Sequence, residues 1–301
     1  MIEYQQARGG VPRIITVDTK LIPLLGKPLR QSISPYMQNA AYHAMGLDAC
    51  YFPIEVEDQD LGTIIAALRV MNVPGFALTT PHKIEVLQYL DQLDELAAKM
   101  GACNTVVNCQ GVLKGYNTDG QGAVMNLIQE GVDLASDTFF LYGAGGTGKA
   151  VAYTLAHHGA KKIYIVSRSN TCEDLARDLN GSFGPVASPC RAAEEEKMLE
   201  MVRNSTVLLN LSGVGMYPDE GETWIKKEAL SHKPVCFDAT YNPQKTQFLL
   251  DAEEMGCKII NGLGMIINQG ALQVKLWTGQ REPYAEMTQA VNELLARQRG
   301  E

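Results

Sequence analysis

The residues best suited to chemistry in this sequence form a glycine-rich run, Gly143-Ala-Gly145-Gly146-Thr-Gly148. An apolar run, residues 138–142, precedes it, and residues 149–158 after it have the pattern of a helix that Gly159 ends. A second apolar run, residues 163–166, follows. Strand, glycine turn, helix and strand in this order form the context in which G-x-G-x-x-G binds a dinucleotide. The pattern predicts such a site, with an ordinary glycine-rich turn as the alternative.

Each part of this motif has a physical role. Gly143 permits a tight turn, Gly145 lets the backbone approach a pyrophosphate, and Gly148 lets the helix pack against the strand. The helix N-terminus offers unpaired N–H groups and the positive end of its dipole to the phosphates. We therefore expect Gly143, Ala144, Gly145, Gly146 and Gly148 to contact the nucleotide.

The residues after the second apolar run indicate which dinucleotide is bound. Sites for NAD place a carboxylate about 20 residues beyond the glycines, whereas sites for NADP place a cation there. The run ends in Ser167-Arg168-Ser169, and the first acid is Glu173. A guanidinium between two hydroxyls suits a 2′-phosphate and can stack on adenine. We therefore expect NADP as the cofactor, with NAD as the alternative. For Arg168 itself, the alternative is an ordinary surface arginine.

A lysine and three predicted helix starts indicate a second site. Ser34-Pro35, Thr80-Pro81 and Asp119-Gly120 each place a capping side chain before a helical pattern. Lys83 falls in the first turn of its predicted helix, where the positive end of the dipole disfavours a cation. An amine there is expected to release its proton more readily, as proton transfer near neutrality requires. Ordinary helix caps and a surface lysine are the alternatives.

The composition narrows the class of protein. The 301 residues exceed one typical domain, and 46% of them are hydrophobic, as in a globular protein. A net charge of −8, with no Lys/Arg block, argues against a nucleic-acid partner. The seven scattered cysteines form no C-x-x-C pair or ligand cluster, which indicates reduced thiols and no metal site. No apolar run has membrane-spanning length, so we expect a cytoplasmic protein.

Apolar and helical patterns alternate along the first part of the chain and predict a small α/β domain with a largely parallel sheet. Residues 106–113 are expected to form a hairpin. The expected strands are Leu21–Leu25, Tyr51–Ile54 and Phe76–Leu78, and the expected helices are Pro35–Met45, Leu61–Met71 and Ile84–Leu90.

Further apolar runs complete a second domain, a doubly wound nucleotide-binding unit of the Rossmann type. Helical patterns at 265–277 and 285–297 are expected to return to the first domain. The expected fold is thus α/β with two domains and a cleft between them. The first domain, which binds the substrate, covers residues 1–124 and is completed by 265–301, and the nucleotide domain covers 125–264.

A series of short motifs runs in order along nearly the whole chain. It begins with Gly26-Lys-Pro28 and Ser32-Ile-Ser34-Pro35 and resembles the motif series of the shikimate/quinate dehydrogenase family. It continues with Thr79-Thr-Pro81-His-Lys83, Gly101-Ala-Cys-Asn104-Thr105, Gly115-Tyr-Asn117-Thr118-Asp119-Gly120, the glycine run at 143–146, Gly213-Val-Gly215-Met216, Asp238-Ala-Thr-Tyr241-Asn242-Pro243, Gly262-Leu-Gly-Met265-Ile-Ile-Asn-Gln269 and Leu276-Trp277-Thr-Gly279.

The resemblance implies a role for particular residues. Lys83 and Asp119 would be the catalytic pair at the hydroxyl that is oxidised. Ser32 and Ser34 would bind the substrate carboxylate, with Tyr241 nearby. The ring hydroxyls and the cofactor would be held by further residues, which are Thr79, Asn104 and Gln269 for the substrate and Gly262, Ser167, Arg168 and Ser169 for the nucleotide.

The activity that the resemblance implies is NAD(P)-dependent interconversion of shikimate and 3-dehydroshikimate, with quinate as an alternative substrate. The protein would be a monomer or homodimer that binds small molecules and neither nucleic acid nor membrane. The competing class is a non-catalytic sensor of NAD(P) and a polyol acid, which the presence of Lys83 and Asp119 argues against.

The sequence departs from the family pattern in ways that leave the substrate and the cofactor open. Gln38-Asn39 stands where the family often has His-Asn, and Gln38 is similar to the branch that also accepts quinate. Ala77-Leu78-Thr79 replaces the usual Asn-Val-Thr, and Ser167-Arg168-Ser169 replaces Asn-Arg-Thr.

Overall fold

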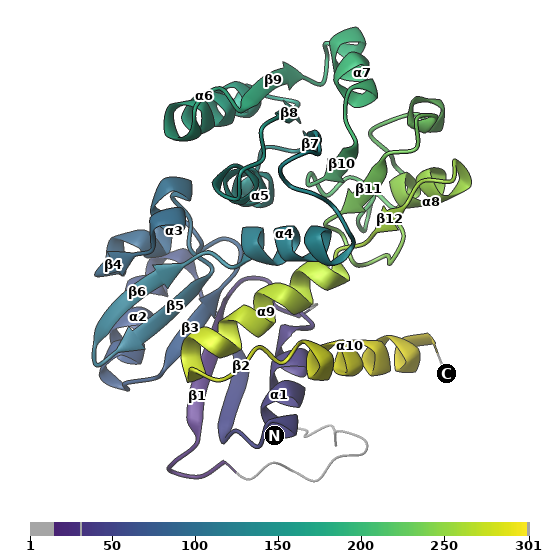
Figure 1. Ribbon diagram of the computed structural model, residues 1–301. Coiled ribbons are helices and arrows are strands. Elements are labelled where there is room, and N and C mark those ends of the chain that lie inside the picture. The colour runs from purple at the N-terminus through teal and green to yellow at the C-terminus, as the bar shows by residue number, and fades with distance from the viewer. Residues whose placement is uncertain (1–14, 31, 300–301) are drawn as a thin grey trace.

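Two sheets that follow one another along the chain form the framework of the molecule, as Figure 1 shows. A computed structural model describes residues 15–30 and 32–299, so the first fourteen residues of the expected first domain lie outside the described part. The first sheet and its helices comprise β1 (Lys20–Gly26), α1 (Ser34–Ala44), β2 (Ala49–Glu55), η1 (Asp58–Asp60), α2 (Leu61–Val70), β3 (Gly75–Leu78), η2 (Glu85–Tyr89), β4 (Gln92–Leu93), α3 (Glu95–Met100), β5 (Thr105–Cys109) and β6 (Val112–Tyr116).

The first sheet is mixed, with the order β2-β1-β3-β5-β6-β4. β1 pairs in parallel with β2 and β3, and β4 pairs in parallel with β6. The expected hairpin is confirmed, because β5 runs antiparallel to β6 through a turn in which Gln110 and Gly111 have positive φ. β5 is also antiparallel to β3, so the expected parallel arrangement holds only in part. As a result, the amino end of β5 and the carboxyl ends of β1, β3 and β6 share one edge of the sheet.

The second sheet is the expected doubly wound unit. After α4 (Asp119–Gln129) it comprises β7 (Phe139–Tyr142), α5 (Gly146–His157), β8 (Ile163–Ser167), α6 (Thr171–Phe183), β9 (Ala187–Arg191), α7 (Glu195–Arg203), β10 (Val207–Asn210), η3 (Lys227–Leu230), β11 (Val235–Asp238), α8 (Gln247–Glu254) and β12 (Ile259–Ile260). All its pairings are parallel, in the order β12-β11-β10-β7-β8-β9. This order places a nucleotide site where the connections change direction, between β7 and β10.

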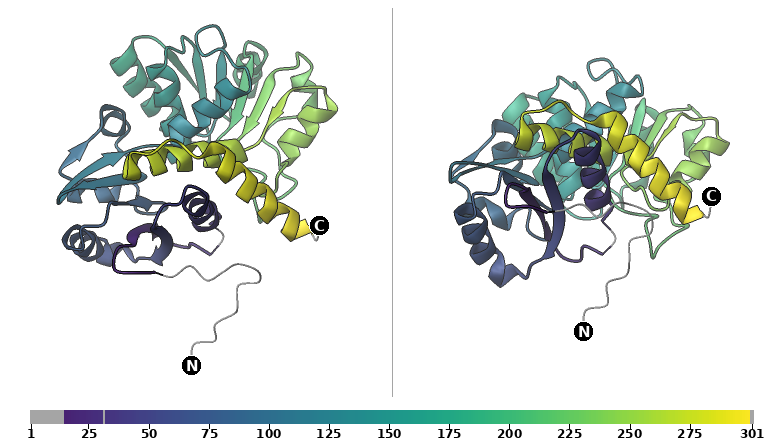
Figure 2. Two further views of the ribbon diagram at one scale, coloured as in Figure 1. Left: turned by 60° about the horizontal axis from the view of Figure 1, so that its bottom comes forward. Right: turned by 90° about the horizontal axis from the view of Figure 1, so that it is seen from below.

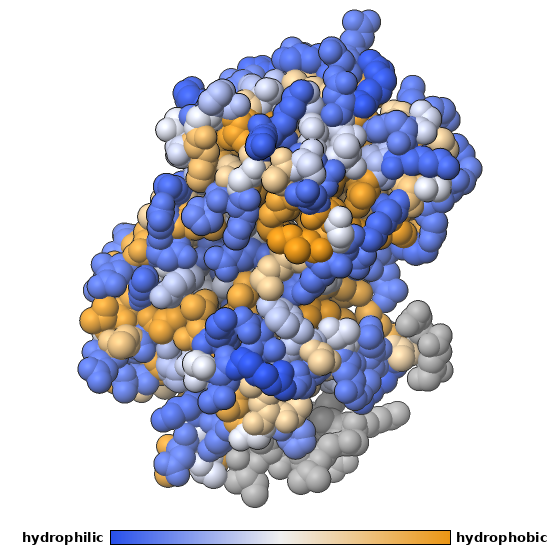
Figure 3. Space-filling view, in the orientation of Figure 1, coloured by the Kyte–Doolittle hydropathy of each residue, from blue (hydrophilic) through white to orange (hydrophobic). Residues whose placement is uncertain are grey.

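The last two helices return to the first sheet, as expected from the sequence. α9 (Leu263–Thr278) lies between α4 and the first sheet, and α10 (Tyr284–Arg299) packs against α1 (Figures 1 and 2). Their buried side chains Ile267, Val274 and Met287 share one core with Met37 and Tyr51. On the face drawn in Figure 3 the surface is mostly hydrophilic, and apolar residues are most evident around its middle.

The expected helix at Ile84–Leu90 and the three expected caps need correction. Residues 80–84 form a turn, and a 3-10 helix, η2, follows it. α1 begins at Ser34 with Ile33 as its N-cap residue, and α4 begins at Asp119 with Thr118 as its N-cap residue. Neither N-cap side chain bonds to its helix, so the side chains of Ser34 and Asp119 remain available for tertiary contacts.

Three features of the composition can be compared with the structure. No disulfide bond joins any of the seven cysteines, all of which lie in the described part of the chain. None of the described helices is long and apolar enough to cross a bilayer. Within residues 15–30 and 32–299, no group of His, Cys, Asp and Glu side chains is arranged to hold a metal ion.

α4 lies between α5 and α9, and its glycines set the distance of closest approach. A Cβ atom added at Gly122 would lie 2.5 Å from the carbonyl oxygen of Met265, and one added at Gly120 would overlap the backbone of Ala150. Such backbone contact is available only where no side chain intervenes. The expected domain boundary near residue 125 therefore falls within a helix that is packed on both sides.

We predict that Gly122→Ala lowers the free energy of unfolding by about 1–3 kcal/mol, because the new methyl group must push α4 away from α9. Denaturant titration followed by circular dichroism measures this. The control is Gly181→Ala in α6, where an added Cβ meets no atom within 4 Å. That change should raise stability by about 0.5–1 kcal/mol. Equal effects of both substitutions would contradict the packing argument.

Candidate active site between the two sheets

Four segments of the first domain meet at one edge of its sheet. The loop after β1 carries Ser32, the loop after β3 carries Lys83, and α4 opens with Asp119 shortly after β6. Asn104 reaches the same edge from the other direction, because it precedes the antiparallel strand β5. Residue patterns single out Lys83 and Asp119, whereas the expectations for Ser32 and Asn104 come from the family resemblance. Asn104 reaches this edge only because β5 is reversed.

Lys83, Asp119 and Asn104 form the polar centre of this edge. Lys83 Nζ lies 2.7 Å from Asp119 Oδ2, and Asn104 Nδ2 donates to Asp119 Oδ1 at 2.8 Å. The side chains of Lys83 and Asp119 are 30% and 16% exposed, so the pair is accessible from one side. The carboxylate thus uses both oxygens to orient an amine that a ligand can still reach.

The turn that carries Lys83 is fixed by its neighbours. The carbonyl oxygen of Lys83 accepts a hydrogen bond from Cys103 N at 2.8 Å. The buried ring of His82 contacts the carbonyl oxygen of Val56 through Nε2 at 2.9 Å. Lys83 lies in the turn that precedes η2, so the expected helix start at this lysine is wrong. Asp119, in contrast, lies in the first turn of α4.

A buried network of amides and hydroxyls supports Asn104. Its Oδ1 accepts from Thr118 N at 2.8 Å and from Thr105 Oγ1 at 2.9 Å. Thr105 Oγ1 in turn accepts from Gln273 Nε2 at 2.9 Å, which ties the network to α9. Gln273 lies 168 residues from Thr105 in the sequence, so no local pattern marks this link.

Gln38 belongs to this supporting network and does not contact the candidate site directly. It is fully buried, and its Nε2 donates to Gln273 Oε1 and to the carbonyl oxygen of Gly270, each at 3.1 Å. The side chain therefore holds α1 to α9. Its similarity to the quinate-accepting branch consequently rests on sequence alone.

Two further expected substrate residues lie close to the polar centre. Gln269 projects from α9, where its Oε1 accepts from Thr118 Oγ1 at 3.4 Å and its Nε2 donates to the carbonyl oxygen of Ile266 at 3.1 Å. Thr79 follows β3, and its backbone N–H donates to the carbonyl oxygen of Leu25 at 2.9 Å. Both side chains thus lie beside the loops that carry Lys83 and Asp119.

Ser32 and Tyr241 come together at a different place, in the wall of a cavity of about 680 Å³ between the loop after β1, the loop after β11 and α10. Ser34 is adjacent, with its N–H directed at Ser32 Oγ at 3.4 Å, but it does not line the cavity. Lys27 N donates to the carbonyl oxygen of Thr80 at 2.9 Å. This bond joins the loop that carries Ser32 to the loop that carries the catalytic lysine candidate.

The glycine run after β7 has the form of a phosphate-binding loop. Gly143 has a φ of +115°, and a Cβ atom at Gly148 would overlap the carbonyl group of Gly143, so these two glycines pack the turn against the helix. A Cβ atom at Gly145 or Gly146 would meet nothing within 4 Å. Open space therefore lies in front of the N-terminus of α5, where phosphate oxygens could accept its free N–H groups.

The turn after β8 leaves a single free cation. Ser167 Oγ donates to the carbonyl oxygen of Ser169 at 2.7 Å and accepts from Cys172 N, which closes the turn. Arg168 is exposed and makes no ion pair with any residue in the described part of the chain. Its position suits a 2′-phosphate better than ribose hydroxyls.

Glu173, the first acid after this strand, is already engaged. Arg191 at the end of β9 bonds Glu173 Oε1 at 2.7 Å, and Cys172 Sγ donates to Glu173 Oε2 at 3.1 Å. These bonds, that of Arg191 foremost, lower the pKa of Glu173 to about 2. The carboxylate that would mark an NAD site is thus held by a neighbouring strand.

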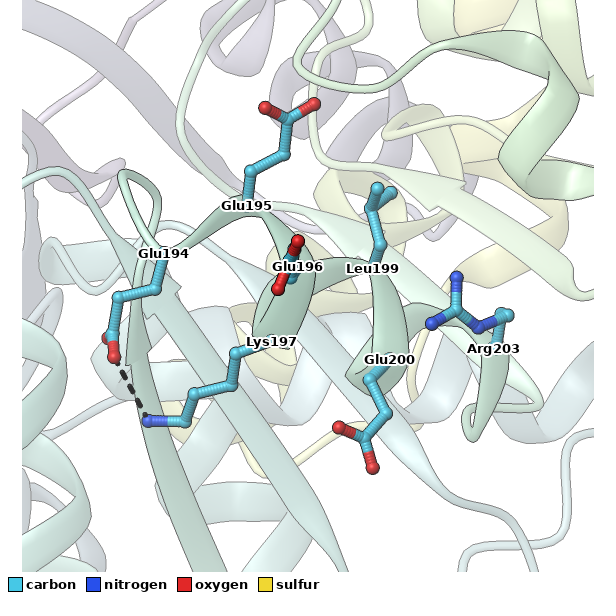
Figure 4. Close-up of a pocket in the computed structure, with 7 residues that line it drawn as sticks. All are labelled: Glu194, Glu195, Glu196, Lys197, Leu199, Glu200 and Arg203. Carbon is cyan, nitrogen blue, oxygen red and sulfur yellow. Dashed lines mark ion pairs between the residues drawn. The ribbon is translucent and has the colours of Figure 1, made fainter.

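Gly262, expected at the cofactor, and a surface depression along α7 are two further candidate positions. Gly262 is the N-cap residue of α9, where a Cβ atom would overlap the carbonyl group of Ala239, so close packing accounts for it. The depression along α7 in Figure 4 is lined by side chains that spread outward, with one ion pair between Glu194 and Lys197. It has the character of a solvated charged helix face.

Comparison with known proteins decides the family. The family model described as the shikimate dehydrogenase substrate binding domain matches residues 24–106, and the shikimate 5'-dehydrogenase C-terminal domain matches residues 262–291. Shikimate dehydrogenase (NADP(+)) from Alkaliphilus oremlandii is 43% identical over 267 residues, which cover 88% of this chain and 93% of the relative. This chain belongs to the shikimate dehydrogenase family.

Solved structures of the shikimate dehydrogenase family share the whole fold. Shikimate 5-dehydrogenase from Listeria monocytogenes, in complex with shikimate and NAD, has a TM-score of 0.90 at 35% identity and covers 93% of this chain and 99% of its own. Quinate dehydrogenase from Corynebacterium glutamicum, in complex with NAD, has a TM-score of 0.84 at 28% identity, with coverage of 91% and 99%. The predicted family and the predicted two-domain α/β fold are confirmed.

We predict that the Glu173–Arg191 pair stabilises the fold in a pH-dependent way. Because the folded pKa of Glu173 lies below the unfolded value, its contribution is present above about pH 4.5 and is lost as the pH falls toward 2. Glu173→Gln should therefore lower Tm at pH 7, and its difference from the parent protein should shrink between pH 4.5 and 3. Glu200→Gln, an exposed acid on α7, is the control and should show no such trend. A Tm difference that is independent of pH would contradict the assignment.

Proposed function

We propose that this protein is an oxidoreductase that interconverts shikimate and 3-dehydroshikimate with NADP, and that Lys83 and Asp119 are its catalytic pair. The observation that carries the proposal is the contact of 2.7 Å between these two side chains, both of which remain partly exposed. The relatives named as NADP-dependent shikimate dehydrogenases support the same activity.

The chemistry follows from the position of the pair. Oxidation of a secondary alcohol removes a hydride from carbon and a proton from the hydroxyl oxygen. Lys83, as a neutral amine within hydrogen-bond reach of that hydroxyl, would accept the proton, and Asp119 would stabilise the resulting ammonium. In the direction of ketone reduction, Lys83 would return the proton to the oxygen. The bound dinucleotide supplies the hydride acceptor or donor.

The remaining roles of the site are assigned by family and position. Ser32 and Ser34, with Tyr241, would bind the substrate carboxylate, and Thr79, Asn104 and Gln269 would bind ring hydroxyls. Asn104 would do so with its orientation already fixed by Asp119, Thr118 and Thr105. A preorganised donor of this kind loses little conformational freedom when the substrate binds.

The residues at the second sheet are suited to NADP. Gly143, Ala144, Gly145, Gly146 and Gly148 would hold the pyrophosphate at the N-terminus of α5. Ser167, Arg168 and Ser169 would hold the 2′-phosphate, since Arg168 is free and Glu173 is not. Gly262 would border the nicotinamide end. NAD remains the alternative cofactor, as in the Listeria complex.

We further propose how the chain is divided and where it acts. The substrate domain would comprise residues 1–124 with 265–301, and the nucleotide domain residues 125–264, with α4 as the helix common to both. Seven cysteines that form no disulfide bonds and a net charge of −8 support a cytoplasmic monomer or homodimer that binds no nucleic acid. Quinate is the second candidate substrate. The non-catalytic sensor is disfavoured, because the described site keeps both catalytic groups in contact.

Absorbance at the nicotinamide band tests this function directly. We expect turnover with shikimate and NADP that exceeds every other pairing of shikimate or quinate with NADP or NAD. The free guanidinium of Arg168 is the reason for the cofactor preference. Binding of shikimate and NADP without turnover in any pairing would favour the sensor and refute the proposal.

A second test concerns the lysine itself. Lys83→Ala should lower kcat roughly 10²–10⁴-fold, the usual contribution of a general acid–base group. NADP affinity, measured by fluorescence titration, should stay nearly unchanged, because Lys83 lies in the loop after β3, in the first domain. Lys99→Ala removes a partly exposed amine, paired with Glu95, from α3 and is the control. A Lys83→Ala enzyme of near-normal rate would remove this residue from the mechanism.

A further inference from the structure

The cavity lined by Ser32 and Tyr241 has one charged residue in its wall, Arg30. Arg30 comes from the loop after β1, and Tyr241 comes from the loop after β11, so the two sheets face each other across this space. No carboxylate lines the cavity. The charge there is therefore opposite in sign to the net charge of the chain, which is −8.

Two acids that contact the loop carrying Arg30 are engaged by other residues of that loop. Glu55 Oε1 accepts from Leu29 N at 2.8 Å, and Glu57 forms an ion pair with Lys27. Among the residues that the structure describes, Arg30 itself has neither an ion pair nor a side-chain hydrogen bond. The exposed guanidinium of Arg30 is therefore available for an anionic ligand.

The other walls of the cavity strengthen such an interaction. Ser32 and Tyr241 contribute hydroxyl groups, while Val291, Leu294 and Leu295 of α10 form an apolar side. Apolar walls displace water and lower the local dielectric constant, so a charge pair beside them is stronger than one in open solvent. A planar guanidinium can also donate two parallel hydrogen bonds to a carboxylate.

We propose that Arg30 binds the carboxylate of the substrate acid together with the hydroxyl of Ser32, and so makes the site selective for acids over their uncharged derivatives. This inference rests on the proposed function, because it assigns a specificity residue to the same reaction. Arg30 lies apart from the Lys83–Asp119 pair, since neither of those residues lines the cavity. Its removal should therefore weaken substrate binding without slowing proton transfer.

The test compares shikimate with its methyl ester, which keeps the ring hydroxyls and lacks the charge. Arg30→Gln should raise KM for shikimate roughly 10- to 100-fold, as expected when a charge-assisted hydrogen bond is lost, and should leave kcat nearly unchanged. KM for the ester and KM for NADP should not change. Arg30→Lys, which keeps the charge and loses the planar fork, should give an intermediate KM for shikimate.

Lys27→Gln is the matched control, because it removes one positive charge from the same loop at a residue that does not line the cavity. It should leave KM for both substrates unchanged. An Arg30→Gln enzyme with normal KM for shikimate, or with equal losses for acid and ester, would overturn the proposal. Equal effects of Arg30→Gln and Lys27→Gln would also overturn it, since they would indicate only the general field of the loop.

Failure of the proposed function is distinguishable from failure of this inference. If the parent protein turns over shikimate and the Arg30 variants have the same KM for shikimate as the parent, the inference alone is wrong. If the parent protein shows no turnover, calorimetric titration with shikimate and its methyl ester still measures whether Arg30 selects the acid. Thermal unfolding of each variant confirms that the fold is retained.

Discussion

The backbone of α4 touches α5 on one side and α9 on the other, and the geometry of the site depends on this contact. Gly120 and Gly122 permit it, because a Cβ atom at either position would overlap the neighbouring helix. α4 begins with Asp119, whose carboxylate fixes Lys83, and α5 begins at the glycine loop that suits a dinucleotide. Close packing of three helices thus sets the distance between the proposed catalytic pair and the loop that would hold the cofactor.

The electrostatic character of the site is local. Although the chain has a net charge of −8, the acids around the proposed ligand positions are already bound to other groups. Glu57 pairs with Lys27, and Glu173 pairs with Arg191. Arg168 and Arg30 are among the described cations without an ion pair, and they lie beside the positions proposed for a phosphate and a carboxylate. Anion binding at these two positions would therefore depend on the local pairing of charges and not on the overall charge.

Much of the fold could be predicted from the sequence because its strands are short, buried and separated by turns. The runs at 139–142 and 207–210 are buried at every position, which gives the continuous apolar pattern of a parallel sheet. The caps at Ser34 and Asp119 and the helix at Lys83 were wrong, because those local patterns ignored tertiary partners. The link from Gln38 through Gln273 to Thr105 could not be predicted, since neither amide has a local partner.

The return of α9 and α10 has a consequence for synthesis of the chain. Met37 and Tyr51 are covered by Ile267, Val274 and Met287, which belong to the last part of the polypeptide. While the ribosome is still producing the nucleotide domain, the first domain has an exposed apolar face, and Gln38 lacks its partner Gln273. Completion of its core must wait for release of the final helices. The nascent chain therefore carries an unfinished first half through most of translation, a period in which chaperone binding would protect it from aggregation.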